Sequence, residues 1–134
     1  MRSILLVLLL LSATSMAAAQ ESREKRLVGD AERGRLVFGQ CRTCHYPERA
    51  MGHNNGPNLH RIFGQVAGKQ SGFDYYSDTF KQADFVWTPE LLDLWLADPM
   101  GMFPDTTMMS PGVPDPQDRA DLIAYLKRAS VREP

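Results

Sequence analysis

Apolar residues recur at helical spacing in three parts of the chain. The first part follows Asp30, a good helix cap, and its apolar positions at 36–38 lead into two cysteines. The second begins at Thr88-Pro89, repeats Leu and Trp through residue 96, and ends at Asp98-Pro99 because the residue before a proline avoids helical angles. The third begins at Asp115-Pro116 and stays amphipathic to residue 129. We therefore expect three to four helices.

Two long stretches between these segments have no helical pattern. Residues 46–72 are rich in Gly, Pro, Asn and His, and residues 100–114 are rich in Met and Pro. No segment alternates apolar and polar residues as a half-buried strand does, so the pattern predicts an all-α fold without a sheet. Long irregular loops in a small domain are usually functional, and short helices bury little surface. An apolar group enclosed by the loops would complete such a core.

The N-terminus has the pattern of a secretory signal. Arg2 precedes an unbroken apolar run at 4–11, and Ala17–Ala19 supply a small-residue cleavage site. The run is shorter than the roughly 20 apolar residues that a membrane-spanning helix needs. We therefore predict a signal peptide at 1–19, a flexible leader at 20–28, one domain at 29–130 and a short tail at 131–134. This organisation predicts export to the periplasm without stable membrane insertion.

Charge is unevenly distributed along the chain. The formal net charge is −1, and no basic patch suggests nucleic acid as a partner. The stretch 82–118 holds seven acidic residues and no Lys or Arg, whereas most basic residues lie between 23 and 81. This asymmetry has two interpretations: a solvated surface, or a dipolar molecule that orients on a partner.

The candidate chemistry lies in the stretch Cys41-Arg42-Thr43-Cys44-His45, which contains both cysteines of the chain. A zinc site would need a fourth ligand from a distant residue. A thioredoxin-like redox pair would need a βαβ unit, which the pattern does not show. A disulfide at this spacing would close almost no loop and would stabilise little. The fourth interpretation is covalent haem c attachment, for which Cys-x-x-Cys-His is the signature.

Haem c explains more of the chain than the other three interpretations do. Two thiols about one helical turn apart can each bond one vinyl group of the porphyrin, and the next residue then directs an imidazole at the iron. Covalent attachment retains the cofactor in an exported protein, and the flat apolar macrocycle supplies the missing core. The sequence therefore predicts one covalent haem c held by Cys41 and Cys44, with His45 as an iron ligand.

Between residues 29 and 129 the chain resembles the class I cytochrome c family, close to the c2 and mitochondrial types. The resemblance is carried by Gly29–Gly34 (GDAERG), the haem motif, residues 56–64 (GPNLHRIFG), Trp87 and residues 121–127 (DLIAYLK). It implies the class I cytochrome c fold and a soluble monomeric one-electron carrier rather than an enzyme. The implied partners are redox proteins: a membrane complex or dehydrogenase as donor, and an oxidase, reductase or photosynthetic centre as acceptor.

The resemblance also assigns roles to residues that spacing alone cannot select. The family pattern Pro-x-x-x-Met matches 104–108, which implies Met108 as the second axial ligand, with Met109 as the alternative. It implies that the Pro57 carbonyl accepts a hydrogen bond from the His45 imidazole. Tyr75 and Trp87 match family donors to a haem propionate. By contrast, we expect His53 and His60 to lie on the surface.

The sequence departs from the family pattern at two positions near the site. Gln65 stands where an arginine near a propionate is common, and Trp95 stands where a tyrosine commonly donates to the methionine sulfur. Two other functions remain open from the residues. One is a haem protein with a labile sixth ligand, peroxidase-like or gas-binding. The other is a cytochrome subunit of a larger oxidoreductase.

Overall fold

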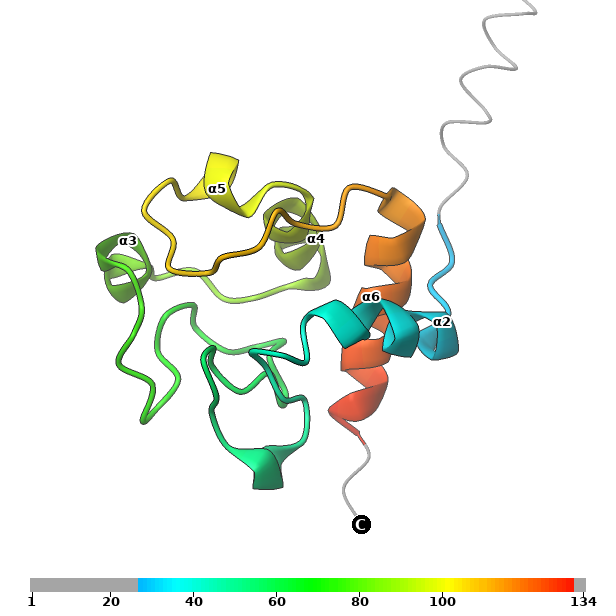
Figure 1. Cartoon of the computed structure of the whole chain (residues 1–134), viewed down its shortest axis with the longest axis horizontal. Coiled ribbons are helices and arrows are strands. Elements are labelled where there is room, and N and C mark those ends of the chain that lie inside the picture. Colours follow the sequence, from blue (N-terminus) through cyan, green and yellow to red (C-terminus); the bar gives the residue numbers. More distant parts are fainter. Residues whose placement is uncertain (1–26, 132–134) are drawn as a thin grey trace, which may run out of the picture.

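A computed structural model describes residues 27–131 (Figure 1). The predicted signal peptide, most of the leader and the last three residues lie outside this part of the chain. Within it, five α-helices and two 3₁₀ turns are connected by long loops. No strand is present among these residues, apart from an isolated bridge between Val66 and Val86. The all-α prediction is confirmed. The helices are α2 (Ala31–Val37), α3 (Asp78–Gln82), α4 (Pro89–Ala97), α5 (Pro99–Met102) and α6 (Pro116–Ala129), and the 3₁₀ turns are Phe38–Gln40 and Arg49–Met51.

The three helices predicted from the pattern begin at the predicted caps. The Asp30 side chain accepts hydrogen bonds from the backbone N–H groups of residues 32 and 33 at the start of α2. Thr88 accepts from the backbone of Leu91 at the start of α4, and Asp115 accepts from residues 117 and 118 at the start of α6. Each cap satisfies backbone donors that would otherwise lack a partner.

Two one-turn helices, α3 and α5, were not expected from the pattern. Ser77 caps α3 by accepting from the backbone N–H of Phe80. Asp98 ends α4 and also caps α5 by accepting from the backbone N–H of Gly101 at 2.9 Å. The stretch 100–114, predicted to be irregular throughout, therefore starts inside a helical turn. The stretch 46–72 is irregular as predicted, apart from the turn at Arg49–Met51.

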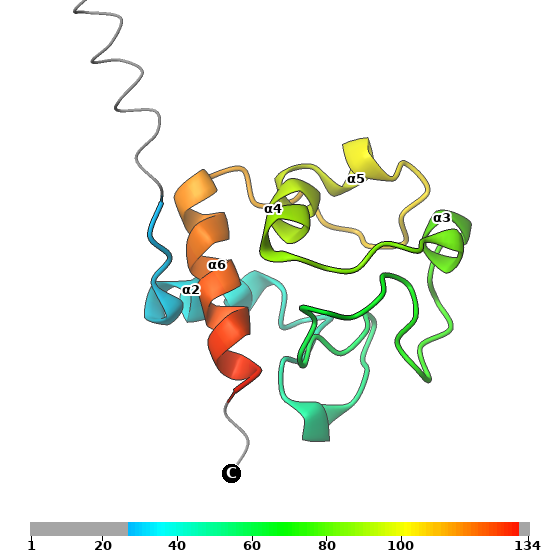
Figure 2. The same cartoon turned by 180° about the vertical axis from the view of Figure 1, so that it is seen from behind.

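Helices α2 and α6 cross in direct contact, as both views show (Figures 1 and 2). A Cβ atom built on Gly34 would lie 1.9 Å from the backbone oxygen of Asp121, so only glycine allows this approach. Beside the crossing, the rings of Phe38 and Tyr125 are 5.3 Å apart, and Leu122 is buried.

A buried carboxylate joins the same two helices. Asp121 is 1% exposed and accepts from Nε of Arg33 at 2.7 Å, from the backbone N–H of Asp30 at 2.7 Å and from Nε2 of Gln117 at 2.9 Å. The hydrogen bonds from these donors lower the pKa of the carboxyl group by more than burial of the charged group raises it. The hydrogen bond from Arg33 is the largest influence, and together they lower the pKa of Asp121 to about 2.

Replacement of Asp121 by asparagine should lower the stability of the holoprotein at neutral pH by about 2 kcal/mol, because the buried carboxylate that accepts charge-assisted hydrogen bonds from the partly exposed Arg33 is lost. The folded pKa of Asp121 lies below its ordinary value. Its contribution to stability is therefore present above about pH 4 and is lost as the pH falls towards 2. Denaturant titrations from pH 7 to pH 2 should show the difference between variant and parent shrinking. The exposed Asp74→Asn serves as control, and a difference independent of pH would contradict the assignment.

A cluster of large aromatic side chains fills the opposite side of the domain. Phe80 lies 5.0 Å from both Trp95 and Phe103 between ring centroids, and Trp87 lies 6.2 Å from Trp95. Trp87, Trp95 and Phe80 are all buried. These rings and the buried residues of the α2–α6 crossing belong to one contiguous hydrophobic core.

Candidate haem site

The cysteine motif continues the winding of the chain beyond α2. The turn Phe38–Gln40 leads to a hydrogen bond from the backbone N–H of Cys41 to the oxygen of Phe38 at 2.9 Å. The N–H groups of Cys44 and His45 then both donate to the oxygen of Cys41, at 3.0 and 2.9 Å. Residues three apart in such a turn lie on one side of it, so Cys41 and Cys44 share a side and His45 follows directly. Both thiols are free.

Cys41 does not have the environment of a redox-active thiol. Burial, followed by the proximity of Cys44, raises the pKa of Cys41 to about 11. A disulfide oxidoreductase needs a thiol whose pKa is lowered, because the thiolate is the nucleophile. A zinc site has no support either. Among residues 27–131, no three Cys, His, Asp or Glu side chains lie close enough together to hold a metal ion.

The His45 imidazole is buried and held in one orientation. Its Nδ1 lies 2.7 Å from the backbone oxygen of Pro57. A carbonyl oxygen only accepts, so Nδ1 carries the proton and Nε2 keeps an available lone pair. Burial lowers the pKa of His45, which favours the neutral imidazole that metals bind. The predicted contact between Pro57 and His45 is present.

Gly56 lies directly against the imidazole ring of His45. A Cβ atom at position 56 would lie 2.3 Å from Cε1 of His45 and 2.7 Å from both ring nitrogens. The backbone N–H of Gly56 donates to the oxygen of Cys44 at 2.8 Å, which fixes the glycine against the haem motif. The absence of a side chain at position 56 thus creates the space that the ring occupies.

Gly56→Ala should push the His45 ring out of this position, because a Cβ so close to ring atoms requires the ring or the loop to move. We expect the holoprotein to lose about 1–3 kcal/mol of stability, the usual range for overpacking. We also expect the ferric spectrum to show partial loss of low-spin iron. Gly52→Ala is a second glycine change in the same loop at which nothing lies within 4 Å of the new Cβ. Because Gly52 has a positive φ of 64°, this control reports loop strain without ring displacement. Identical spectra for the two variants would contradict the prediction.

The two candidate methionines differ in how far they are buried. Met108 is half-buried and packs against the hydrophobic core, whereas Met109 is 98% exposed. The backbone around Met108 is fixed, since its N–H donates to Oγ1 of Thr106 at 3.1 Å and its carbonyl accepts from Ser110 at 2.9 Å. Oγ1 of Thr107 donates to the backbone oxygen of Tyr75 at 2.9 Å. That bond ties the methionine loop to the segment before α3.

The two predicted propionate donors have different surroundings. Trp87 is 8% exposed, and its backbone N–H donates to the oxygen of Gln65 at 2.9 Å. Tyr75 is 75% exposed, and its ring contacts Phe73 at 5.8 Å between centroids. The neighbouring Tyr76 packs against the core, and burial raises the pKa of its hydroxyl. The propionate roles of Tyr75 and Trp87 stay predictions.

The prediction that His53 and His60 lie on the surface is only partly right, because both side chains are half-buried. His53 is half-buried, and both of its ring nitrogens make hydrogen bonds within the protein. The ring nitrogens of His60 are buried as well. The cause is the fold of the 46–72 loop, which closes on itself through long-range hydrogen bonds that no sequence period reveals.

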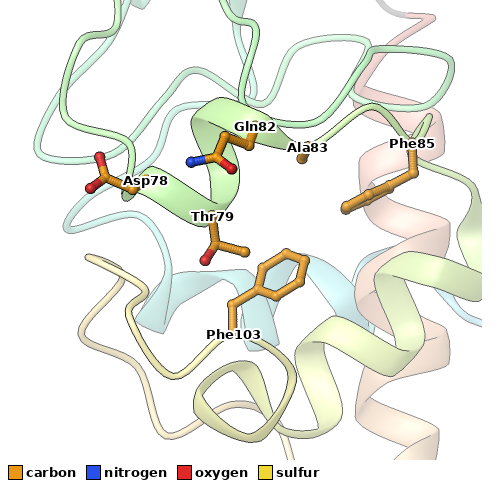
Figure 3. A pocket seen from close by; sticks show the side chains of 6 residues that line it. All are labelled: Asp78, Thr79, Gln82, Ala83, Phe85 and Phe103. Carbon is orange, nitrogen blue, oxygen red and sulfur yellow. The ribbon is translucent and has the colours of Figure 1, made fainter.

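A surface pocket of about 360 Å³ lies apart from these residues, between α3 and the aromatic cluster (Figure 3). Phe85 and Phe103 form its apolar side, and polar side chains of α3 form its rim. None of the predicted site residues lines it. The haem-site prediction therefore depends on the cysteine motif and on the loops around it, and this pocket plays no part in it.

The residues that meet at the motif fit a covalently bound haem. Two free thiols lie one turn apart, a buried imidazole has one nitrogen committed to a carbonyl, and a glycine makes room for the ring. A thioether, Met108, lies in a second fixed loop. A small all-α domain with c-type haem attachment is the class of protein that this fold and this site define.

Comparison with known proteins identifies the family. The family model for cytochrome c matches residues 31–130. Cytochrome c of Ginkgo biloba is 38% identical over 106 residues, which cover 78% of this chain and 93% of the relative. Cytochrome c2 of Rhodomicrobium vannielii is 37% identical over 110 residues, covering 82% and 87%. The solved structure of cytochrome cH from Methylobacterium extorquens has a TM-score of 0.68 and 39% identity, covering 75% of this chain and 99% of that one.

This chain belongs to the cytochrome c family, in its class I fold. Members of the family attach one haem c covalently and carry electrons without catalysing a reaction of their own. The predictions of the fold class, of one covalent haem c and of a non-enzymatic electron carrier are therefore confirmed. In the part of the chain that the structure describes, no helix is both long and apolar enough to span a bilayer.

Proposed function

We propose that this cytochrome is an exported one-electron carrier whose haem is attached through Cys41 and Cys44 and whose iron is ligated by His45 and Met108. The observation that carries the proposal is the 2.7 Å contact between Nδ1 of His45 and the Pro57 carbonyl. It leaves Nε2 as the nitrogen that can bind iron. When bound, the haem supplies a ferric/ferrous couple, and His/Met ligation favours a high reduction potential.

The fixed position of Met108 favours a carrier over a haem protein with a labile sixth ligand. Three hydrogen bonds hold its loop to other elements. The backbone N–H of Thr79 donates to Asp105 at 3.0 Å, Thr107 donates to Tyr75 at 2.9 Å, and Val113 donates to the oxygen of Leu96 at 2.7 Å. A loop anchored at both ends and in the middle resists the displacement that would open a coordination position.

Optical spectroscopy of the holoprotein tests the ligand set. A low-spin ferric spectrum with the far-red band typical of sulfur ligation, and no carbon monoxide binding at neutral pH, is the expected result. High-spin iron that binds carbon monoxide would instead support a peroxidase-like or gas-binding protein. Gel filtration of the native extract distinguishes a free monomeric shuttle from a subunit of a larger oxidoreductase.

Export to the periplasm belongs to the same proposal. It is supported by Arg2, the apolar run at 4–11 and the Ala17–Ala19 cleavage site, all of which lie outside the described residues. We expect N-terminal sequencing of the mature protein to begin at Gln20. A mature protein that retains residues 1–19 would contradict the signal-peptide assignment.

Docking to redox partners should depend weakly on salt. Exposed apolar side chains, including Met51 at 51% and Met109 at 98%, come from the loops after the haem motif and after α5. The stretch 82–118 has no Lys or Arg to steer an acidic partner. We therefore expect the association rate with a donor or acceptor complex to change less than about threefold between low and physiological salt. Stopped-flow kinetics measures this, and a steep fall in rate with added salt would contradict it.

A further inference from the structure

Two phenyl rings form the apolar wall of the surface pocket beside α3. Phe85 and Phe103 come from different segments of the chain, and their side chains point toward the same space (Figure 3). Their ring centroids are 6.2 Å apart, and the ring planes are tilted by 46°. Phe85 packs edge-on against the buried Trp87, with centroids 5.0 Å apart. Phe103 lies 5.7 Å from the buried Trp95, so the core holds both rings in place.

The polar rim of the pocket offers hydrogen-bond acceptors. It consists of three exposed side chains of α3, namely Asp78, Thr79 and Gln82. Hydrogen bonds from the backbone and from the hydroxyl of Thr79 lower the pKa of Asp105, so the hydroxyl proton is committed and its oxygen can accept. Among the described residues that line the pocket, Asp78 alone is ionisable. The rim therefore suits a ligand that donates hydrogen bonds.

The charges around the pocket favour a cation. Lys81 lies 3.9 Å from Asp78, but the two side chains are 54% and 88% exposed, so this pair contributes little. Nζ of Lys69 donates to the backbone oxygen of Lys81 and is engaged there. The stretch 82–118, which supplies both phenyl rings, holds seven acidic residues and no Lys or Arg. An anion would be repelled by this stretch and a cation attracted.

The phenyl rings favour one kind of cation. A guanidinium is planar, stacks on aromatic faces and carries five N–H donors, whereas an ammonium is compact and more strongly hydrated. The chain already makes one such contact, since the guanidinium of Arg42 lies 5.8 Å from the ring centroid of Tyr46. An aromatic wall next to a rim of acceptors therefore fits an arginine side chain.

The size of the pocket indicates how that arginine is presented. Its volume of about 360 Å³ is near the lower end of the range of small-molecule sites, and its rim is exposed. A free small molecule would keep much of its surface in water there and would bind weakly. A side chain that projects from a partner protein is held in addition by the contacts around it.

The pocket lies beside the loop that carries Met108. Phe103 is the residue that ends α5 and begins this loop. The backbone N–H of Thr79 donates to Asp105 at 3.0 Å, which joins the rim of the pocket to the same loop. A partner bound at the pocket would therefore contact the segment that holds the proposed iron ligand.

We propose that this pocket is a docking subsite that receives an arginine side chain of a redox partner protein. The guanidinium stacks on the wall formed by Phe85 and Phe103 and donates to Asp78 and Gln82. This inference rests on the proposed function as a carrier that docks with redox proteins. Because the subsite is one local contact, its loss raises the dissociation rate and leaves the weak salt dependence of association unchanged.

The amide of N-acetyl-arginine is the probe for the chemistry of the pocket. Titrated into the reduced holoprotein, it should shift the backbone amide signals of Thr79, Gln82 and Ala83 in a saturable way in proton–nitrogen NMR spectra. The amides of N-acetyl-lysine and N-acetyl-leucine should shift these signals less at equal concentration. The proposal is overturned if the three signals do not move, or if either of the other amides moves them as far.

Phe85→Leu keeps the wall apolar and removes one ring face, so it should weaken binding of the arginine probe about two- to fivefold. Asp78→Asn should weaken binding by a similar factor, and its exposed position keeps the test valid if Phe85→Leu folds poorly. The matched controls are the exposed Asp74→Asn and Phe63→Leu, at a ring outside the pocket that Lys127 already covers at 5.9 Å. Equal weakening by a variant and its control would overturn the proposal.

Turnover with native membranes and periplasmic extract tests the docking role. For oxidation or reduction of the holoprotein, Phe85→Leu should raise KM about two- to fivefold while kcat and the reduction potential stay unchanged, and Phe63→Leu should alter none of them. An unchanged KM for Phe85→Leu would overturn the proposal. Failure of the proposed function is distinguishable, because the parent protein would then not turn over at all, and the amide titration would still decide the chemistry of the pocket.

Discussion

Met108→Ala is expected to lower the reduction potential on the order of a few tenths of a volt, since axial ligands set haem potentials over a range of about 0.8 V. The thioether is a soft ligand that favours ferrous iron, and its loss removes that preference. The same variant should lose the far-red ferric band and should bind carbon monoxide in the ferrous state. Redox titration and optical spectra of the purified holoprotein measure these changes.

The neighbouring methionine provides the matched control. Met109 is 98% exposed, whereas Met108 packs against the core, so Met109→Ala should leave both the spectrum and the potential unchanged. If the two variants exchanged these phenotypes, Met109 would be the ligand. If neither variant altered the spectrum, a methionine outside this loop or a histidine would have to hold the sixth position.

Gly34→Ala is expected to destabilise the holoprotein by at least about 3 kcal/mol, the upper end of the usual cost of overpacking. Alanine favours a helix over glycine by up to about 1 kcal/mol, so helix propensity alone predicts the opposite sign. The steric clash has a larger effect on stability than helix propensity, because the new Cβ would lie 1.9 Å from the backbone oxygen of Asp121. The backbone of α6 cannot move aside without separating the two helices, which chemical denaturation would register.

Gly39→Ala tests whether the effect belongs to the helix crossing. Nothing lies within 4 Å of a Cβ built at position 39, five residues after Gly34 in the 3₁₀ turn Phe38–Gln40. We expect this variant to be neutral or slightly stabilising, by no more than about 1 kcal/mol. Equal destabilisation by the two alanines would show that glycine flexibility, and not close packing, explains the sequence.

The parts of the fold that follow from local chemistry could be predicted from the sequence. Asp30, Thr88 and Asp115 cap helices where their spacing to apolar residues predicts them. The helices α3 and α5 were missed because one turn shows no period, and their formation depends on single caps, Ser77 and Asp98. Short helices of this kind are decided by tertiary packing more than by propensity.

The site also contains residues that the sequence predicts and contacts that it does not. Cys41, Cys44 and His45 are adjacent in sequence and carry a recognisable signature, whereas Met108 could be selected only through the family pattern. The pairing of Asp121 with Arg33 and the bond between His53 and Ser71 join residues 88 and 18 positions apart. A single sequence does not reveal which distant polar groups meet, so these buried contacts appear only in the folded chain.

The most direct test of the account is the intact mass of the protein matured in a host that attaches haem c. A mass equal to the processed polypeptide plus one haem, unchanged after denaturation and acid-organic extraction, is the predicted result, with both Cys41 and Cys44 unavailable to a thiol reagent. A polypeptide without the added mass and with two reactive thiols would contradict covalent attachment and every role assigned around it.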